Sequence, residues 1–132
     1  MLFKQTLLLS SALALLSLPV IASANLDTFN HTNEDSSVKI LKTGICSSKV
    51  PVFGTYTPAN GQSSVTALGV RAICAAGSGE CMADIYMSRD CSGPVVANAK
   101  LNLGSITVTS IDMVSTKYRI DSGGSVINIY YA

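Results

Sequence analysis

The segment from Val95 to Leu103 constrains the fold most, because its side chains alternate between apolar and polar more strictly than any others in the chain. One side carries the apolar residues Val95, Ala97, Ala99, Leu101 and Leu103, and the other carries Asn98, Lys100 and Asn102. A period of two predicts a β-strand that is buried on one face. Gly104 and Ser105 follow at once, and a glycine-first loop is typical of a type II′ hairpin. We therefore expect the chain to turn back here, with Leu101 facing Val108 and Leu103 facing Ile106.

A second hairpin is expected just before this strand, over 64–74 and 81–88, with Cys74 facing Cys81. In this register one apolar face collects Leu68, Val70, Ala72, Ala83, Ile85 and Met87. The same register places Arg71 opposite Asp84, a weakly favourable cross-strand pair. The apolar pattern and the charge pair thus favour one arrangement.

Further strands are predicted over 38–45, 52–57, 117–121 and 126–131. Asn60 and Gly61 indicate a hairpin loop, and the last hairpin is expected to pair Tyr118 with Ile129 and Ile120 with Ile127. The alternation changes phase at Ser110, which predicts a bulge or corner where the strand passes from one sheet to another.

No window of ten or more residues after residue 24 shows helical periodicity. The sequence therefore predicts an all-β fold, an antiparallel meander of about eight strands packed as a two-layer sandwich. A small closed barrel is the alternative. The phase change at Ser110 favours the sandwich, since a strand that turns a corner supplies the second sheet.

Three regions are expected along the chain. Residues 1–24 resemble a cleavable signal peptide, with Lys4, an apolar run to Ile21 and a small-residue cleavage site ending at Ala24. Residues 25–37 are polar and without period, which predicts a flexible leader, and residues 38–132 form a single disulfide-braced β domain. The leader contains a glycosylation sequon at Asn30, whose use the residues alone leave open. These features predict a secreted or periplasmic protein.

All four cysteines lie in the exported part of the chain, and an even count in an oxidising compartment predicts two disulfides. Chain entropy does not separate the three possible pairings. The distance that a disulfide can span does separate them, because Cys91 lies beyond the far end of the predicted strand that begins at Cys81. We expect Cys74 to pair with Cys81, and Cys46 with Cys91.

Charge and motif content exclude several functions. Removing Lys4 leaves eight Lys and Arg against eight Asp and Glu, so residues 25–132 carry no basic field for nucleic acid or for a membrane surface. The single histidine, His31, falls in the predicted leader, where it would be a poor general base. The cysteine and carboxylate spacings are not those of metal sites, so we expect no metal and no cofactor.

A small disulfide-braced sheet suits the presentation of loops or of a sheet face more than it suits chemistry. We expect a secreted, non-enzymatic binding protein with a protein or glycan partner, and Tyr86 and Tyr130 are its candidate contact residues because they lie opposite the apolar face. One alternative is a small hydrolase that uses the carboxylates Asp84, Asp90 or Asp112. Another is a periplasmic inhibitor or envelope protein that forms one stable complex.

The stretch from Cys81 to Gly93 reads C-x-A-x-I-Y-M-x-x-x-C-S-G and is followed by Pro94. This stretch resembles small exported bacterial proteins of unassigned function. The resemblance covers about forty residues and implies export, without supplying a catalytic residue.

Overall fold

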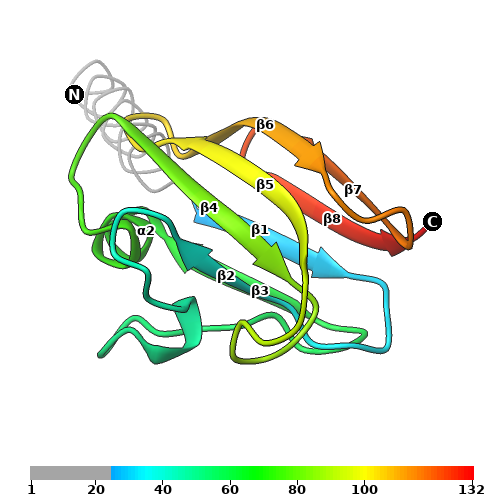
Figure 1. Ribbon diagram of the computed structural model, residues 1–132. Coiled ribbons are helices and arrows are strands. Elements are labelled where there is room, and N and C mark those ends of the chain that lie inside the picture. The colour runs from blue at the N-terminus through cyan, green and yellow to red at the C-terminus, as the bar shows by residue number, and fades with distance from the viewer. Residues whose placement is uncertain (1–24) are drawn as a thin grey trace, which may run out of the picture.

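The structure, a computed structural model, describes residues 25–132. The predicted signal peptide over 1–24 lies outside the described residues. The elements in chain order are β1 (Asn25–Asn30), β2 (Ser37–Ile40), η1 (Ser47–Lys49), β3 (Gln62–Thr66), α2 (Ala67–Cys74), β4 (Glu80–Tyr86), β5 (Val95–Asn102), β6 (Thr107–Met113), β7 (Tyr118–Gly123) and β8 (Val126–Tyr131). Figure 1 labels them.

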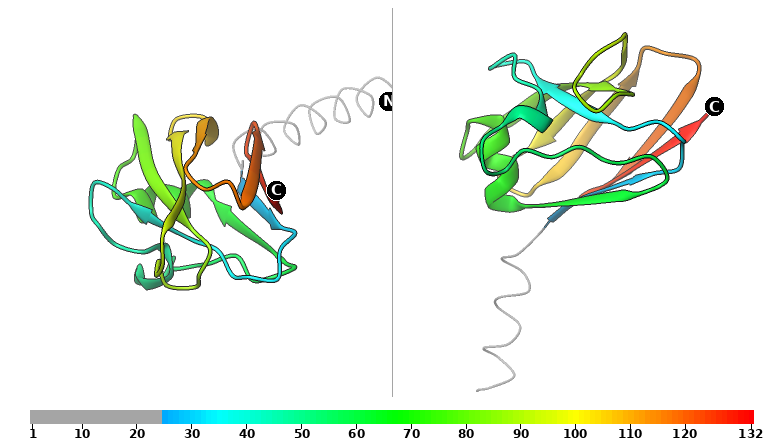
Figure 2. Two further views of the ribbon diagram at one scale, coloured as in Figure 1. Left: turned by 45° about the vertical axis from the view of Figure 1, so that its right-hand side comes forward. Right: turned by 90° about the horizontal axis from the view of Figure 1, so that it is seen from below.

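The eight strands form two four-stranded sheets, with the orders β3-β1-β8-β7 and β2-β4-β5-β6. Figures 1 and 2 show the two sheets stacked face to face, with α2 at one end. The predicted sandwich is therefore confirmed over the barrel. The pairing is antiparallel except between β1 and β8, which run parallel.

The inner faces of both sheets supply the core. The largest apolar side chains that are at most 2% exposed are Ile85, Leu103, Ile106 and Ile129. Burying each of them contributes roughly 1.5–3 kcal/mol to folding. β5 places Ala97 and Leu101 in this core, as predicted, but a register shift against β4 buries Val96 and leaves Val95 half-buried.

The prediction of a flexible leader over 25–37 is wrong. Asn25–Asn30 form β1, which lies between β3 and β8 inside its sheet. The alternation is hidden because the inward positions after Leu26 are the polar residues Thr28 and Asn30. The side chain of Asn30 is only 2% exposed, and its Nδ2 donates to the Glu34 carbonyl at 2.6 Å. The sequon amide is thus buried and already bonded.

The predicted strand over 64–74 is wrong beyond Thr66, because Ala67–Cys74 form the helix α2. Thr66 caps it, with Oγ1 accepting a hydrogen bond from Gly69 N at 3.1 Å, and Ala75 ends it in the left-handed conformation. The buried side of α2 carries Gly69, Val70, Ile73 and Cys74, a spacing that matches a helical period. Leu68, Val70 and Ala72 match the period of a strand equally well, so the pattern did not separate the two structures.

The predicted pairing of Arg71 with Asp84 is therefore also wrong. Arg71 instead donates from Nε and Nη2 to the Leu103 carbonyl, at 3.1 and 2.9 Å, and so ties α2 to the end of β5. Asp84 accepts a hydrogen bond from Asn98 Nδ2 at 2.6 Å.

The predicted strand over 52–57 is also wrong, and the one over 38–45 is shorter than expected. Residues 41–61 form a loop with the short helix η1, which ends one residue before Val50. Val52 is 95% exposed with a φ of +67°, a conformation that a β-branched residue rarely adopts. The turn at Asn60 and Gly61 does form, with Gly61 N donating to the Pro58 carbonyl, but β3 then pairs with β1.

The structure forms the disulfides Cys46–Cys91 and Cys74–Cys81, with Cα–Cα distances of 5.8 and 6.0 Å. The second joins the end of α2 to β4, where a hairpin was expected. The first ties the loop before η1 to the loop after β4.

The two C-terminal hairpins differ from expectation in detail. Leu101 does face Val108, and the register shift at Lys100 and Leu101 leaves Thr109 as an extra residue beside Ser110. That bulge does not carry the strand into the other sheet, since β6 stays beside β5 along its length and the chain crosses only after Met113. The last hairpin pairs Tyr118 with Tyr131, two residues from the predicted register, so that each side chain keeps its expected face.

Candidate functional site

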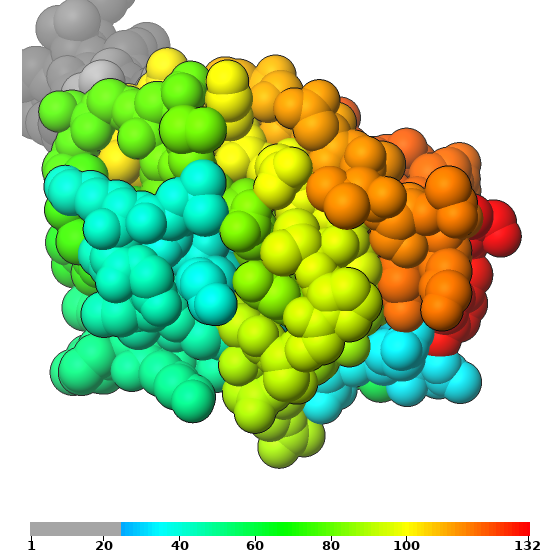
Figure 3. Space-filling model, in the orientation of Figure 1, coloured from blue at the N-terminus to red at the C-terminus, as the bar shows by residue number. Residues whose placement is uncertain are grey.

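Tyr86, one of the two predicted contact residues, is not on the surface. The last residue of β4 is only 6% exposed, and Lys39 Nζ lies 5.4 Å from the centroid of its ring. Its partner on β2, Ser37, bonds the loop after β4, because Ser37 Oγ accepts from Cys91 N at 2.9 Å. In Figure 3 the yellow-green atoms of this loop lie beside the cyan atoms of β2. The disulfide at Cys91 folds the loop back, which removes Tyr86 from the candidate site.

Tyr130, the other predicted residue, lies on the outer face of the sheet β3-β1-β8-β7 between two neighbours. The His31 ring stacks on it, with centroids 4.5 Å apart and planes 4° apart. The Arg119 guanidinium carbon lies 4.5 Å from the same ring centroid. Because β8 lies between β1 and β7, the three side chains form one row across the sheet. We call His31, Tyr130 and Arg119 the stacked row.

Polar and aromatic side chains continue this outer face beside the stacked row. The strand register sets Gln62, Phe29, Asn128 and Asp121 in a second row across the four strands. Asn128 Oδ1 lies 3.3 Å from His31 Nε2, and Asp121 Oδ2 lies 3.6 Å from Arg119 Nη1. One hydrogen bond and one ion pair thus join the two rows.

A pair of stacked tyrosines lies at the end of the sandwich next to this face. Tyr118 and Tyr131 stack with their centroids 5.8 Å apart. The Tyr118 hydroxyl donates to Glu34 Oε2 at 2.7 Å, and the Tyr131 hydroxyl donates to Asn33 Oδ1. The hydrogen bond to the Glu34 carboxylate, followed by burial, raises the pKa of Tyr118 to about 12. The segment after β1 is therefore bonded to both β7 and β8.

The sequence did not indicate His31, Glu34 or Tyr131 as partners of these rings. Each contact joins residues more than 80 positions apart, and all of them depend on β1 lying beside β8. The period-two pattern of β8, with Ile127 and Ile129 facing inward, did indicate that Tyr130 faces outward.

The candidate carboxylates lie elsewhere. Asp84 and Asp112 flank Asn98 in the strand register of the other sheet, on its outer face. Two strand spacings separate them by roughly 10 Å. Asp90 is exposed in the loop after β4. None of the three lines the cavity between the two sheets or the hollow beside Leu41 and Met82.

Within residues 25–132 no helix has the length and apolar character that a bilayer crossing requires.

Known proteins match the chain over most of its length. The model of a protein family described as "T2SS substrate NttC" matches residues 1–127. The crystal structure of the Legionella pneumophila type II secretion system substrate NttC has a TM-score of 0.67 and 23% sequence identity to the chain, and the match covers 83% of this chain and 98% of that chain. At this identity the likeness shows the fold alone. The curated proteins gave no significant match.

Proposed function

Because this chain belongs to the family of the type II secretion system substrate NttC, we propose that it is itself secreted and acts by binding a protein partner. The family is one of secreted proteins, and the two disulfides fit an extracellular or periplasmic location. The contact surface that we propose is the outer face of the sheet β3-β1-β8-β7, centred on the stacked row.

The observation that carries the proposal is the arrangement of His31, Tyr130 and Arg119 in the free protein. Tyrosine and arginine contribute a large share of the binding energy in many protein interfaces. Here their side chains already stack on one another, so that binding would immobilise few additional rotamers. Tyr130 lies on β8 and Arg119 on β7, and His31, directly after β1, is held to β8 because its backbone N donates to the Ile129 carbonyl at 2.8 Å.

The same geometry favours a protein over a glycan as the partner. A sugar stacks on an uncovered aromatic face, whereas His31 and Arg119 lie against the Tyr130 ring from the strands on either side. The stacked row lies outside the cavity between the two sheets and outside the hollow beside Leu41 and Met82. A row of side chains on the outer face of a sheet suits a partner of protein size.

Site-specific photo-crosslinking tests this proposal. One derivative carries the crosslinker in place of Arg119 on the proposed face, and a matched derivative carries it in place of Asn98 on the outer face of the other sheet. Both are exposed to the culture medium and the envelope fraction of the producing organism. We expect one protein to be crosslinked from position 119 and not from position 98, and Tyr130→Ala to reduce that product at least fivefold.

The melting temperature of each variant separates loss of contact from loss of folding. Equal products from positions 119 and 98 would contradict the proposed face. A retained product in the Tyr130→Ala variant would do the same. Binding of the unmodified protein to a glycan array, reduced by Tyr130→Ala, would overturn the choice of a protein partner.

A further inference from the structure

The two sheets enclose a cavity that the proposed contact surface does not use. Its volume is about 120 Å³ and it is partly open to solvent. The sheet β3-β1-β8-β7 contributes Leu26 and Val65, and the other sheet contributes Ala83 and Leu101. α2 closes one end with Ile73. These side chains face inward, whereas the stacked row faces outward.

Small side chains explain why this part of the core is open. Ala83 on β4 and Ala99 on β5 lie directly opposite each other in the strand register, and both line the cavity. Most protein interiors leave few voids larger than a water molecule. Two facing methyl groups in place of larger apolar side chains leave the space unfilled.

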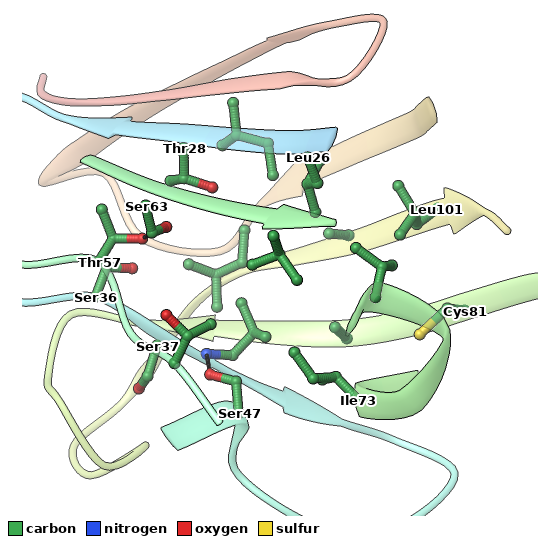
Figure 4. Close-up of a pocket in the computed structure, with 18 of the residues that line it drawn as sticks. Leu26, Thr28, Ser36, Ser37, Ser47, Thr57, Ser63, Ile73, Cys81 and Leu101 are labelled. Atoms are coloured by element: carbon green, nitrogen blue, oxygen red, sulfur yellow. Dashed lines mark hydrogen bonds between the residues drawn. The ribbon is translucent and has the colours of Figure 1, made fainter. Parts of the chain in front are cut away.

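The cavity has one polar end and one apolar end. Figure 4 shows the labelled hydroxyl side chains at one end, Thr28, Ser36, Ser37, Ser47, Thr57 and Ser63, and shows Leu26, Ile73, Cys81 and Leu101 toward the other. Thr57 Oγ1 and Ser63 Oγ lie 2.6 Å apart, so one of them donates to the other. This bond uses one of the two hydroxyl hydrogens and leaves the second for a ligand.

The lining also carries almost no charge. Lys100 is the one charged residue along it, and Lys100 lies between Ala99 and Leu101, whose side chains face inward. Alternation along β5 therefore directs its ammonium group to the outer face. A charged ligand would lose its hydration without gaining a partner of opposite charge.

From these observations we propose that the cavity binds a small, uncharged amphipathic molecule, one ring or a short alkyl chain that bears a hydroxyl or carbonyl group. The apolar part lies between the sheets against Leu26, Ala83 and Leu101. The polar group meets the hydroxyl pair of Thr57 and Ser63. The volume is of the order of the roughly 150 Å³ apolar cavity that holds one benzene molecule.

Three probes that share a benzyl group test the proposal: benzyl alcohol, toluene and benzylammonium. Amide shifts in two-dimensional NMR spectra of the oxidised protein report binding. We expect saturable shifts at cavity residues with benzyl alcohol, roughly fivefold weaker binding of toluene, which lacks the hydroxyl, and at least tenfold weaker binding of benzylammonium. Removing both hydroxyl groups, in a variant that carries Thr57→Val and Ser63→Ala, should remove the preference for benzyl alcohol over toluene.

Cavity-filling variants provide the specificity control. Ala99→Leu should abolish benzyl alcohol binding, and Ala83→Leu is the second variant in case the first does not fold. Ala72→Leu places the same extra atoms on an exposed position of α2 and should bind like the unmodified protein. The proposal is overturned if no probe gives saturable shifts, if benzylammonium binds as well as benzyl alcohol, or if both filled variants still bind. Arg119→Ala should leave benzyl alcohol binding unchanged, which separates this test from that of the proposed contact face.

Discussion

Replacing Asn30 by alanine should destabilise the domain substantially, because this side chain fixes the turn that follows β1. Asn30 Oδ1 accepts hydrogen bonds from the backbone N of Thr32 at 3.1 Å and from its hydroxyl at 2.8 Å. Nδ2 donates to the Glu34 carbonyl at 2.6 Å. Asn30 and Thr32 are 2% and 1% exposed, so water cannot replace these partners in the folded state.

The cost follows from which groups keep a partner in the variant. The Thr32 hydroxyl and the Glu34 carbonyl still bond each other at 3.2 Å. The Thr32 N–H loses its acceptor and stays buried. Three hydrogen bonds at roughly 0.5–1.5 kcal/mol each give a loss of about 1.5–4.5 kcal/mol in the free energy of unfolding, and the stranded donor places the expected value in the upper half of this range. A domain of this size has roughly 5–15 kcal/mol in total.

Guanidinium chloride unfolding followed by circular dichroism measures this loss, provided that the slope with denaturant is unchanged. Asn98→Ala is the matched control, since Asn98 is exposed and bonds only the surface carboxylate of Asp84. We expect about 0.5 kcal/mol or less for the control. A loss below about 1 kcal/mol for Asn30→Ala would refute the reasoning, because a flexible leader would tolerate that change.

Two further predictions concern pH and the disulfides. Because the bond to Glu34 raises the pKa of Tyr118 to about 12, against about 10 in the unfolded chain, its contribution to stability is complete below pH 10 and is lost as the pH rises toward 12. Urea midpoints measured across this range should fall more steeply for the unmodified protein than for Tyr118→Phe, and parallel curves would contradict the assignment. Replacing both cysteines of Cys46–Cys91, which are 45 residues apart, should cost about 4 kcal/mol, against about 2 kcal/mol for the pair Cys74–Cys81, which are 7 apart. Denaturant titration of the two double-alanine variants should preserve this order, and the reverse order would show that chain entropy does not dominate.

The sequence predicted the strands whose inward positions are apolar and failed where those positions are polar. β5 could be identified because Ala97 and Leu101 alternate with Asn98 and Lys100. β1 could not, because its inward positions include the polar residues Thr28 and Asn30, and Asn30 is satisfied by hydrogen bonds to Thr32 and Glu34 in the turn that follows the strand. Of the stacked row, only the outward orientation of Tyr130 could be predicted, because it follows from the alternating pattern of β8.

The helix α2 shows a different limit. Its eight residues include Leu68, Val70 and Ala72, which satisfy a period of two as well as Val70 and Ile73 satisfy a helical one. Two turns are too short for periodicity to distinguish these cases. The capping residues carried the distinguishing signal, since Thr66 precedes the apolar run as an N-cap does.

The parallel pairing of β1 with β8 also determines how late this sheet can be completed as the chain folds. Asp27 pairs with Val126, so β1 has one of its two neighbours at a distant position in the sequence. A contact across about a hundred residues forms slowly, because its loop-closure entropy is lost before the contact is made. Until β8 docks, one edge of β1 remains without a partner. The topology therefore makes the arrival of β8 the event that completes the sheet β3-β1-β8-β7.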